Sequence, residues 1–319
     1  MVNKGEEANM KKALVLGASG GMGFSIVQEL SERGIEVIAF ARTKGKLDKL
    51  FGNHANVTTF AGDIFQAQDI LEAAKGVDVI FQSANIPYRE WEDKLELFMS
   101  NILLAAKEHS TKLAIVDNIY AYGRSDGGKV SEDFPKKPHT KKGRIRLKLE
   151  KLIKESEVDA LIAHFPDFYG PNAENTILHY TLEGIVKGKK AGFVGSQNIK
   201  REYIYTPDGA KAIVNLAIDE RAYGQNWNIP GYDSISGIEL VKIIRELTGY
   251  EKGVFTISKN MIRCLGVFDK NMREVVEMFY LNEQPVVLDG SKYEQIIGEV
   301  PQTSYREGLK QTIDYMRGS

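Results

Sequence analysis

Three glycines near the start of the chain have the spacing of a phosphate-binding turn. Residues 13–23 read Ala-Leu-Val-Leu-Gly-Ala-Ser-Gly-Gly-Met-Gly, with Gly17, Gly20 and Gly23 three apart. In such a turn the first glycine permits a tight bend, the second lets backbone approach a diphosphate, and the third allows close helix packing. The helix that follows directs free N–H groups and its positive end at the anion. The run predicts a dinucleotide site that also includes Ser19, Gly21 and Met22, rather than a merely structural turn.

The end of the second predicted strand bears on the form of the dinucleotide. An acidic residue there would bind the ribose 2′-hydroxyl and repel a 2′-phosphate. This chain has Phe-Ala-Arg-Thr-Lys at 40–44, and Arg42 stands where the ribose contact is expected. A guanidinium with Lys44 and Lys46 nearby suits a phosphate. We therefore predict NADP, with NAD as a second option and an ordinary solvated basic turn as the alternative.

Two further loops follow predicted strands and belong to the same expected cleft. Asp63 and Ile64 come after the third strand, where the Asp carboxylate could bond the adenine amino group. Ser83, Ala84 and Asn85 come after the fourth strand, and these small side chains would let the dinucleotide pass. The carboxyl ends of parallel strands meet at one edge of a sheet, so these loops should lie together.

The elements that would position these residues alternate between strand and helix in the first half of the chain. This alternation predicts an α/β fold with a doubly wound parallel Rossmann sheet. We assign residues 11–170 to a dinucleotide-binding domain, after a disordered leader at 1–10. Residues 171–319 should form a smaller mixed α/β C-terminal substrate lobe, which could exchange segments with the first domain. The expected strands are 12–17, 36–41, 57–61, 77–81, 112–117 and 159–164, followed by 202–205, 226–229, 254–258 and 285–288. The expected helices are 24–33, 66–75, 90–109, 141–155, 174–187, 206–219, 237–248 and 303–317.

Composition narrows the class of protein. The chain has 319 residues, 43% of them hydrophobic, and a net charge of −1, so no global field attracts nucleic acid or a membrane surface. Cys264 is the only cysteine, which excludes an internal disulfide and any multi-thiolate metal site. The five histidines show no metal-ligand spacing. With no apolar run of transmembrane length, we predict a cytoplasmic protein without a metal site, and a small molecule as its partner.

Taken together, these motifs resemble the extended short-chain dehydrogenase/reductase family, the NAD(P)-dependent epimerases and dehydratases. The resemblance includes the glycine run, Gly62-Asp-Ile64, Asp117-Asn-Ile-Tyr-Ala-Tyr-Gly123, Phe165-Pro-Asp-Phe-Tyr-Gly-Pro171 and Arg201-Glu-Tyr-Ile-Tyr-Thr-Pro-Asp208. It implies the Rossmann fold, a nicotinamide dinucleotide cofactor, and contacts of Phe165 and Pro166 with that cofactor. It also implies a monomer or a homodimer.

The catalytic set of that family is altered in this chain. The slot of the family serine or threonine holds Asn118, the tyrosine slot holds Lys142 and the lysine slot holds Arg146. No Tyr-x-x-x-Lys occurs between Gly123 and Glu150. We predict that Asn118 orients a carbonyl, that Arg146 holds the nicotinamide ribose, and that Lys142 or Asp167 supplies the proton. The alternative is that these residues only anchor cofactor or substrate.

The resemblance also implies substrate contacts at His164, Tyr169, Arg201 and Tyr203. His164 replaces the usual arginine and Asp167 the usual asparagine, which argues against a nucleotide-diphosphate substrate. We expect an NAD(P)-dependent oxidoreductase or epimerase that acts on a sugar-like or other secondary alcohol or ketone. The rival is a non-catalytic dinucleotide sensor whose bound state is read by a partner protein. Loss of the Tyr-x-x-x-Lys set favours that rival, and the preserved substrate motifs oppose it.

Overall fold

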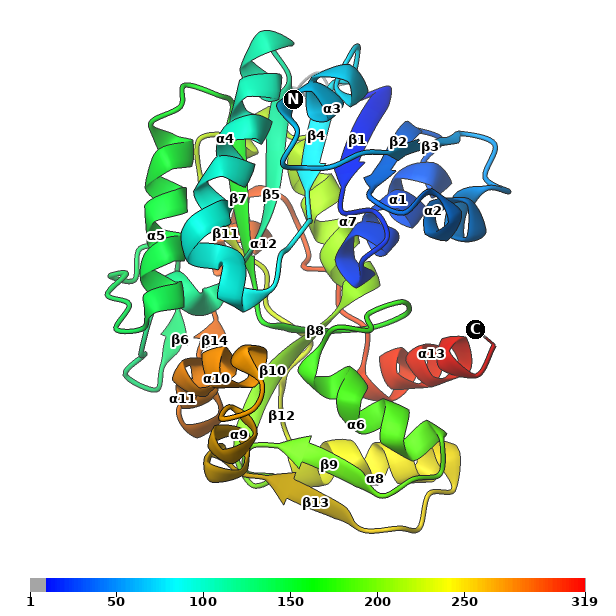
Figure 1. The fold of residues 1–319 in the computed structure, drawn as a ribbon, viewed down its shortest axis with the longest axis vertical. Helices are drawn as coiled ribbons and strands as arrows, with labels where there is room; N and C mark the ends of the chain where they lie inside the picture. Colours follow the sequence, from blue (N-terminus) through cyan, green and yellow to red (C-terminus); the bar gives the residue numbers. More distant parts are fainter. Residues whose placement is uncertain (1–9, 319) are drawn as a thin grey trace.

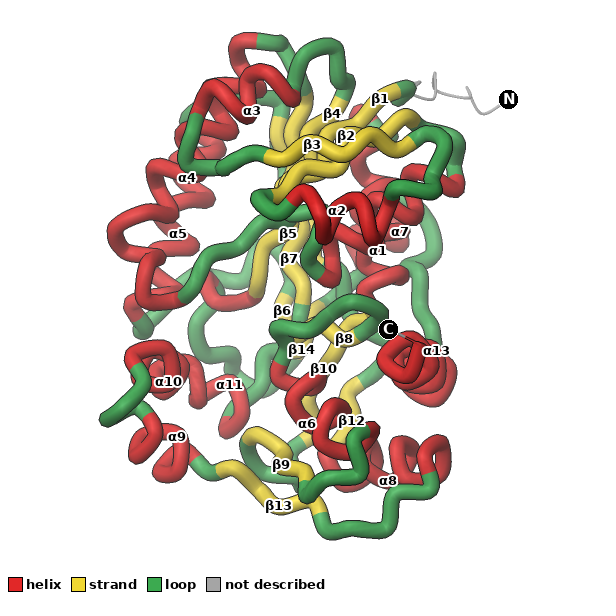
Figure 2. The backbone as a smooth tube through the Cα atoms, turned by 45° about the vertical axis from the view of Figure 1, so that its right-hand side comes forward, coloured by secondary structure: helices red, strands yellow, loops and turns green. Residues whose placement is uncertain are grey.

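A computed structural model describes residues 10–318, except for the side chain of residue 271. Most of the predicted leader, 1–9, lies outside the described residues. Met10, its last residue, is packed into the core beside the first strand. Figure 1 shows an upper α/β layer and a smaller lower lobe, and Figure 2 shows the same two parts from the side.

The upper layer is built on a seven-stranded sheet with the order β11-β7-β5-β4-β1-β2-β3, in which every pairing is parallel. Strand order reverses between β1 and β4, and this switch point is where ligands bind in doubly wound sheets. The predicted Rossmann fold is confirmed. The strands are β1 (Lys12–Leu16), β2 (Glu36–Ala41), β3 (Val57–Ala61), β4 (Val79–Gln82), β5 (Lys112–Asn118), β7 (Ala160–Phe165) and β11 (Asn226–Asn228).

Helices cover both faces of this sheet and enclose two separate apolar cores. One core lies under α1 (Gly21–Glu32), α2 (Lys44–Phe51), α7 (Thr206–Ala217) and α12 (Ser291–Ile296). The other lies under α3 (Ala67–Ala73), α4 (Trp91–Glu108) and α5 (Lys141–Lys154). The continuous apolar runs of β1 and β4 are explained by this burial on both faces. Short 3₁₀ turns η1 (Tyr88–Glu90), η2 (Ile119–Ala121) and η3 (Glu220–Ala222) complete the layer.

The lower lobe contains a three-stranded sheet, β12-β10-β8, and a two-stranded sheet, β13-β9. A third pair joins β14 to β6. The chain does not divide cleanly at residue 170, because α7, β11 and α12 return to the upper layer. The strands are β6 (Lys129–Val130), β8 (Asp167–Tyr169), β9 (Ala191–Val194), β10 (Lys200–Tyr205), β12 (Ser234–Ser236), β13 (Val254–Ile257) and β14 (Val287–Leu288). The helices packed on them are α6 (Ile177–Val186), α8 (Gly237–Thr248) and α13 (Tyr305–Gly318).

A group of short helices, which we call the cap, lies between the two parts. It consists of α9 (Lys259–Leu265), α10 (Lys270–Val275), η4 (Val276–Phe279) and α11 (Tyr280–Glu283). In Figure 1 the cap sits below the lower ends of α4 and α5, and α10 contacts η1 of the upper layer. The sequence patterns predicted none of these helices.

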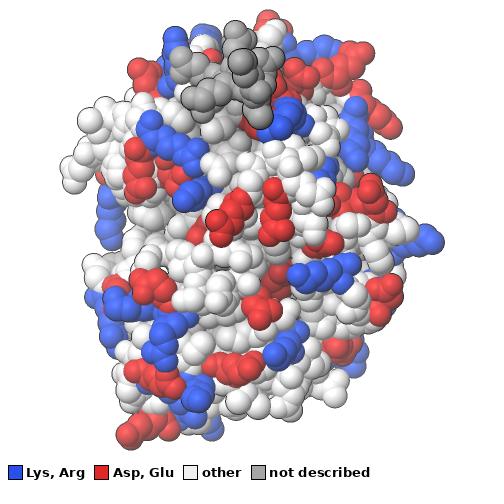
Figure 3. All heavy atoms as spheres, turned by 180° about the vertical axis from the view of Figure 1, so that it is seen from behind, with Lys and Arg blue, Asp and Glu red and all other residues white. Residues whose placement is uncertain are grey.

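Charges of both signs are interspersed over the surface in Figure 3, and no single-sign field is visible on that face. Within residues 10–318, no helix combines the length and apolarity needed to cross a bilayer. The same described residues contain no cluster of three or more His, Cys, Asp or Glu side chains arranged to hold a metal ion.

Glu202 on β10 gives the lower lobe an expected pH dependence. Burial raises the pKa of this carboxyl from 4.5 to about 8, although the backbone N–H groups of Leu288 and Gly231 oppose the shift. The folded state therefore binds the Glu202 proton more tightly than the unfolded state. Its contribution to stability is complete below pH 4.5 and is lost as pH rises through 8.

We expect the unfolding free energy of the wild type to fall by roughly 3–5 kcal/mol between pH 5 and pH 9 through this group. Glu202→Gln should show a flatter decline, although its amide accepts only one of the two N–H bonds and lowers stability at pH 5. Denaturant titrations at both pH values measure this difference. An equal fall in unfolding free energy from pH 5 to pH 9 in the two proteins would show that the pKa of Glu202 does not change on folding.

Candidate active site

The glycine loop between β1 and α1 has the geometry that its sequence predicts. Gly17 has φ +83°, and a Cβ there would lie 2.5 Å from the Ala84 Cα. A Cβ on Gly23 would overlap the Gly17 carbonyl oxygen and approach Ser83 Oγ to 2.7 Å. Gly20 differs, because the only atom near its Cβ position is the Gly17 oxygen at 3.5 Å. Two of the glycines are thus required for packing, and Gly20 leaves open space at the N-terminus of α1.

A cleft of about 590 Å³ begins at this loop and runs along the carboxyl ends of β1, β2 and β4. Most of the residues predicted for the cofactor line it. They are Gly17, Ser19, Gly20, Gly21, Met22, Arg42, Ile64, Ser83, Ala84 and Asn85.

Four predicted cofactor residues do not line the cleft. Gly23 does not line the cleft, because it packs the helix against the strand. Asp63 directs its carboxylate at its own turn, where Oδ1 accepts from Phe65 N at 3.0 Å. Phe165 is buried in the core and Pro166 is also buried, while Phe168 forms the wall at this point. The predicted Asp63–adenine bond and the Phe165 and Pro166 contacts therefore find no support in the geometry.

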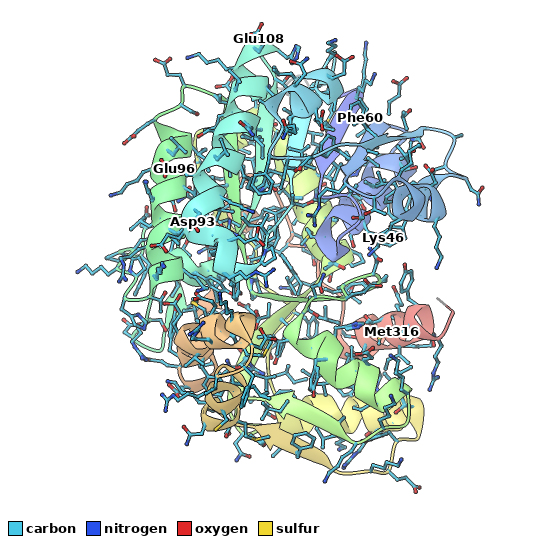
Figure 4. The ribbon with its side chains drawn as sticks, viewed as in Figure 1. Lys46, Phe60, Asp93, Glu96, Glu108 and Met316 are labelled. Carbon is cyan, nitrogen blue, oxygen red and sulfur yellow. The ribbon has the colours of Figure 1, made fainter. Side chains whose placement is uncertain are left out.

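The segment after β8 closes over the glycine loop. Asn172, at φ +57°, donates from Nδ2 to the Ser19 carbonyl at 3.1 Å. Across the cleft mouth, Lys46 of α2 pairs with Glu174 at 3.2 Å. Figure 4 shows Lys46 on the part of α2 nearest the lower lobe. The segment after β8 is therefore tied to the glycine loop by a hydrogen bond and to α2 by an exposed ion pair.

Cationic side chains gather at the β2 end of the cleft. Arg42, Lys46 and Arg89 all line it, and Arg42 forms no ion pair or hydrogen bond with the described residues. Lys44 turns away, because its ammonium bonds Asp48 and Thr59 at 3.0 Å each. Arg42 is thus the exposed cation best placed to meet an added phosphate.

The residues in the three altered catalytic slots lie close together but face different partners. Asn118 Oδ1 accepts from Tyr120 N at 3.0 Å, and its amide NH₂ has no partner among the described residues. Arg146 pairs with Asp117 at 3.3 Å, and its guanidinium lies 4.3 Å from the Trp91 ring centroid. Arg146 Nε is buried without a partner in the described part of the chain.

Lys142 corrects our prediction of a proton donor. Its side chain is only 1% exposed, and Nζ pairs with Glu274 at 2.5 Å and Glu277 at 2.8 Å. The ammonium thus faces two carboxylates of the cap and not a substrate position in the cleft. Lys142 links α5 to the cap.

Asp167 acts on two tyrosines, Tyr88 and Tyr120, that the sequence analysis did not select. Burial raises the pKa of its carboxyl, opposed by Arg201. Its charge also acts on Tyr88, Tyr120 and Tyr203. Tyr88 and Tyr120 share a hydroxyl–hydroxyl hydrogen bond of 2.5 Å. We call Tyr88, Tyr120, Arg146, Asp167 and Tyr203 the polar cluster.

Residues 17–190, more than half of the chain, match the model of a family described as NAD(P)H-binding. The chain belongs to this NAD(P)H-binding family.

Similar proteins extend the likeness over nearly the whole chain. One is an uncharacterized UDP-glucose epimerase, YtcB, of Bacillus subtilis, 25% identical over 96% of this chain and 98% of that protein. Another is the UDP-N-acetyl-alpha-D-glucosaminuronate decarboxylase of Bacillus cytotoxicus, 23% identical with the same coverage of both chains. Among solved structures, UDP-glucuronic acid 4-epimerase from Bacillus cereus in complex with NAD has a TM-score of 0.79 at 19% identity, covering 96% of this chain and 99% of that one.

These matches confirm the recognised family and the extended short-chain fold of this NAD(P)H-binding protein. The matches are compatible with NAD and with NADP. The sugar chemistry in the names of the two relatives is a property of those relatives.

Two of the predicted substrate residues lie away from the cleft, and this corrects their roles. His164 is fully buried, with Nε2 2.9 Å from Lys136 Nζ and Nδ1 3.2 Å from the Asn118 carbonyl. Burial lowers the pKa of His164 to about 3, so the ring is neutral. Tyr169 is buried in the core of the lower lobe, between Tyr205 and Tyr305.

The other two, Arg201 and Tyr203, lie under the cap. Arg201 bonds Asn282 of α11 and the Val194 carbonyl, so its guanidinium is already engaged. Tyr203 presents a buried hydroxyl without a partner among the described residues. Of the four predicted substrate residues, Tyr203 alone keeps a free polar atom beside Asp167.

Proposed function

We propose that this protein is an NADP-preferring oxidoreductase or epimerase acting on a secondary alcohol or ketone. The observation that carries this proposal is the cleft, whose open Gly20 position leads from the helix N-terminus along the strand ends. The site suits a dinucleotide sterically as well as electrostatically. The space in front of Gly20 is open, and a Cβ there would project into it. When bound, the nicotinamide supplies or accepts a hydride at its C4 carbon.

In this proposal the chain's own residues divide the work of binding. Backbone N–H groups from Ser19 to Met22 would hold the diphosphate, and Ser83, Ala84 and Asn85 would flank the dinucleotide. Arg42 would take the 2′-phosphate. Arg146 would hold the nicotinamide ribose, and the free amide of Asn118 would orient a substrate carbonyl.

A sugar-like substrate is favoured by the relatives, which are named for UDP-sugar chemistry. In this chain Arg201 is occupied by Asn282 and Val194, and His164 is sealed in the core. Both features argue against a diphosphate contact at these positions. We therefore propose a sugar-like or other hydroxylated substrate without a required nucleotide-diphosphate group.

Stopped-flow absorbance of enzyme-bound NADPH tests the proposal against a panel of ketones, free sugars and UDP-sugars, with NADP and the alcohols for the reverse direction. We expect oxidation of bound NADPH with at least one carbonyl compound. Tight coenzyme binding without turnover across the panel would instead support the dinucleotide sensor.

Cofactor preference gives a separate prediction. NADPH should raise the melting temperature more than NADH at equal concentration, because Arg42 is unpaired at the ribose end of the cleft. Arg42→Asp should reverse the order, with a change of about tenfold or more in the ratio of dissociation constants, about 1.4 kcal/mol.

Lys44→Ala is the matched control, since this neighbouring cation faces Asp48 and Thr59. It should leave the order of the two coenzymes unchanged. An Arg42→Asp protein that still prefers NADPH would remove Arg42 from the phosphate site.

A further inference from the structure

Two tyrosines form a hydroxyl pair next to residues that line the cleft. Tyr88 belongs to η1 and directly follows Ile86 and Pro87, which line the cleft. Its hydroxyl lies 2.5 Å from that of Tyr120, on η2. Trp91 supports both rings, with centroids at 4.9 Å from Tyr88 and 6.2 Å from Tyr120. A phenol pair of this kind needs no further protein partner to stay in place.

The pair also has cations beside it. Lys142 Nζ lies 5.4 Å from the Tyr88 ring centroid, and Arg146 stacks on the same Trp91 that supports the pair. The positive charge of Arg146 acts on both hydroxyls. Burial raises the pKa of the Tyr88 hydroxyl, and a hydrogen bond donated from Tyr120 and the charge of Arg146 act in the opposite direction, toward the phenolate.

Two buried polar atoms of the polar cluster have no hydrogen-bond partner among the described residues. Arg146 Nε and the Tyr203 hydroxyl are buried and lack partners among the described residues. Buried polar atoms are normally satisfied, so orphaned atoms beside a carboxylate and two phenols indicate a place for a polar ligand. The cap holds this place away from solvent, because α10 contacts η1 and is tied to α5 through Lys142.

We propose that Tyr88 is the acid–base of this enzyme and that Tyr120 positions it. This rests on the proposed oxidoreductase function. In reduction, the substrate carbonyl carbon receives the hydride of the reduced nicotinamide, and the carbonyl π pair moves onto oxygen. That oxygen takes the proton of the Tyr88 hydroxyl and becomes an alcohol. The Tyr88 phenolate accepts a hydrogen bond from Tyr120 until the alcohol leaves, when water that enters the vacated site returns the proton. Oxidation runs these steps in reverse.

This arrangement would restore a tyrosine–cation couple from different parts of the chain. The cation comes from α5, where Arg146 stands, while the phenol comes from the loop after β4. Asp167 faces the same hydroxyls and would bind a substrate hydroxyl next to the carbonyl, with its charge opposing premature ionisation of Tyr88.

Three phenylalanine variants test the proposal. Tyr88→Phe should lower kcat by about a thousandfold, within the range of general acid–base catalysis, and Tyr120→Phe by about tenfold. Tyr122→Phe is the control, because this buried tyrosine follows η2 and donates to Asn228 Oδ1 at 2.7 Å, outside the pair. All three should bind NADPH in calorimetry as the wild type does.

Fluorine NMR of fluorotyrosine-labelled protein without coenzyme gives a readout independent of turnover. The resonance of residue 88, assigned by its loss in Tyr88→Phe, should titrate at higher pH in Tyr120→Phe, because the donated hydrogen bond is gone. Tyr122→Phe should leave that titration unchanged.

The outcomes separate this proposal from the function on which it rests. A wild type that binds NADPH but turns over nothing overturns both. A turning-over wild type whose Tyr88→Phe variant stays within about threefold of Tyr122→Phe overturns the role of Tyr88 alone. An unchanged residue 88 titration in Tyr120→Phe overturns the positioning role of Tyr120.

Discussion

Gly20→Val is expected to abolish binding of both NADPH and NADH while leaving the fold intact. Gly20 is the N-cap of α1, with φ −92° and ψ 167°, an extended conformation that a β-branched residue adopts readily. Its Cβ would meet only the Gly17 oxygen at 3.5 Å and then project into the cleft. The side chain would occupy the place of the diphosphate and block its approach to the N–H groups of α1.

We expect the dissociation constants to rise at least a hundredfold, about 2.8 kcal/mol, when measured by calorimetry. The melting temperature without coenzyme should stay close to that of the wild type. Gly45→Ala, in α2 with no atom near its Cβ position, is a matched control and should bind as the wild type does. Wild-type affinity in Gly20→Val would show that the diphosphate does not lie against this turn.

Gly23→Ala, by contrast, should damage the fold first. Its new methyl group would overlap the Gly17 carbonyl oxygen, a rigid backbone atom. The two glycines therefore separate a binding effect from a packing effect within one motif. This contrast agrees with the separate roles that the spacing predicts for Gly20 and Gly23, and the structure adds which atoms a side chain would meet at each.

Local sequence patterns were sufficient to predict the sheet and the glycine loop. The apolar runs of the six strands in the first half, and their separation by helical segments, set the topology. Their predicted ends agree with the structure to within two residues. The missed α2 is short, and only Leu47 and Phe51 in it are buried, so its apolar pattern is weak.

The catalytic region could not be predicted in the same way, because its contacts join distant parts of the chain. Lys142 meets Glu274 and Glu277, which lie 132 and 135 residues further on. The cap that carries these carboxylates is a set of helices too short to produce a clear period. No local signal at Lys142 shows whether its ammonium faces a substrate or a carboxylate.

Tyr120 was within reach of the sequence, since it lies between Asn118 and Gly123 in a motif that already carried the family resemblance. Tyr88 had a weaker signal, three residues after Asn85. Their pairing depends on how η1 and η2 approach each other across β4 and β5. This is a tertiary fact, so the absence of Tyr-x-x-x-Lys from the sequence does not indicate which other phenols lie near Arg146.

A charge network centred on the buried pair Lys136–Glu150 joins α5 to β7 and β11. Glu150 forms ion pairs with Lys136 and, at 2.9 Å, with Lys154, and it accepts from Asn226 at 2.7 Å. Lys136 continues to His164, whose other nitrogen is bonded to the Asn118 carbonyl. The network thus supports the backbone on which Asn118 stands.

Removing Glu150 should be the most destabilising single change in this network. Glu150→Leu leaves the Lys136 ammonium buried without a carboxylate, which costs about 3–5 kcal/mol of unfolding free energy. Lys136→Met should cost less, because Glu150 keeps Lys154 and Asn226. The double variant, with both charges gone, should recover much of the loss, so a double-mutant cycle should be strongly non-additive. Additive single effects would show that the pair is not coupled.

The pH dependence of the unfolding free energy of the same proteins tests the direction of the Glu150 pKa shift. Burial alone would raise the pKa of Glu150, but the charge of Lys136, with the hydrogen bonds from Lys136 and Asn226, lowers it from 4.5 to about 2. The contribution of this carboxylate is complete above pH 4.5 and is lost as pH falls toward 2. Over that interval the wild type should lose roughly 3 kcal/mol through Glu150, and the double variant should not. Since the Glu202 contribution declines in the opposite direction, as pH rises from 4.5 through 8, the two carboxyls should give the wild type a stability maximum between their folded-state pKa values.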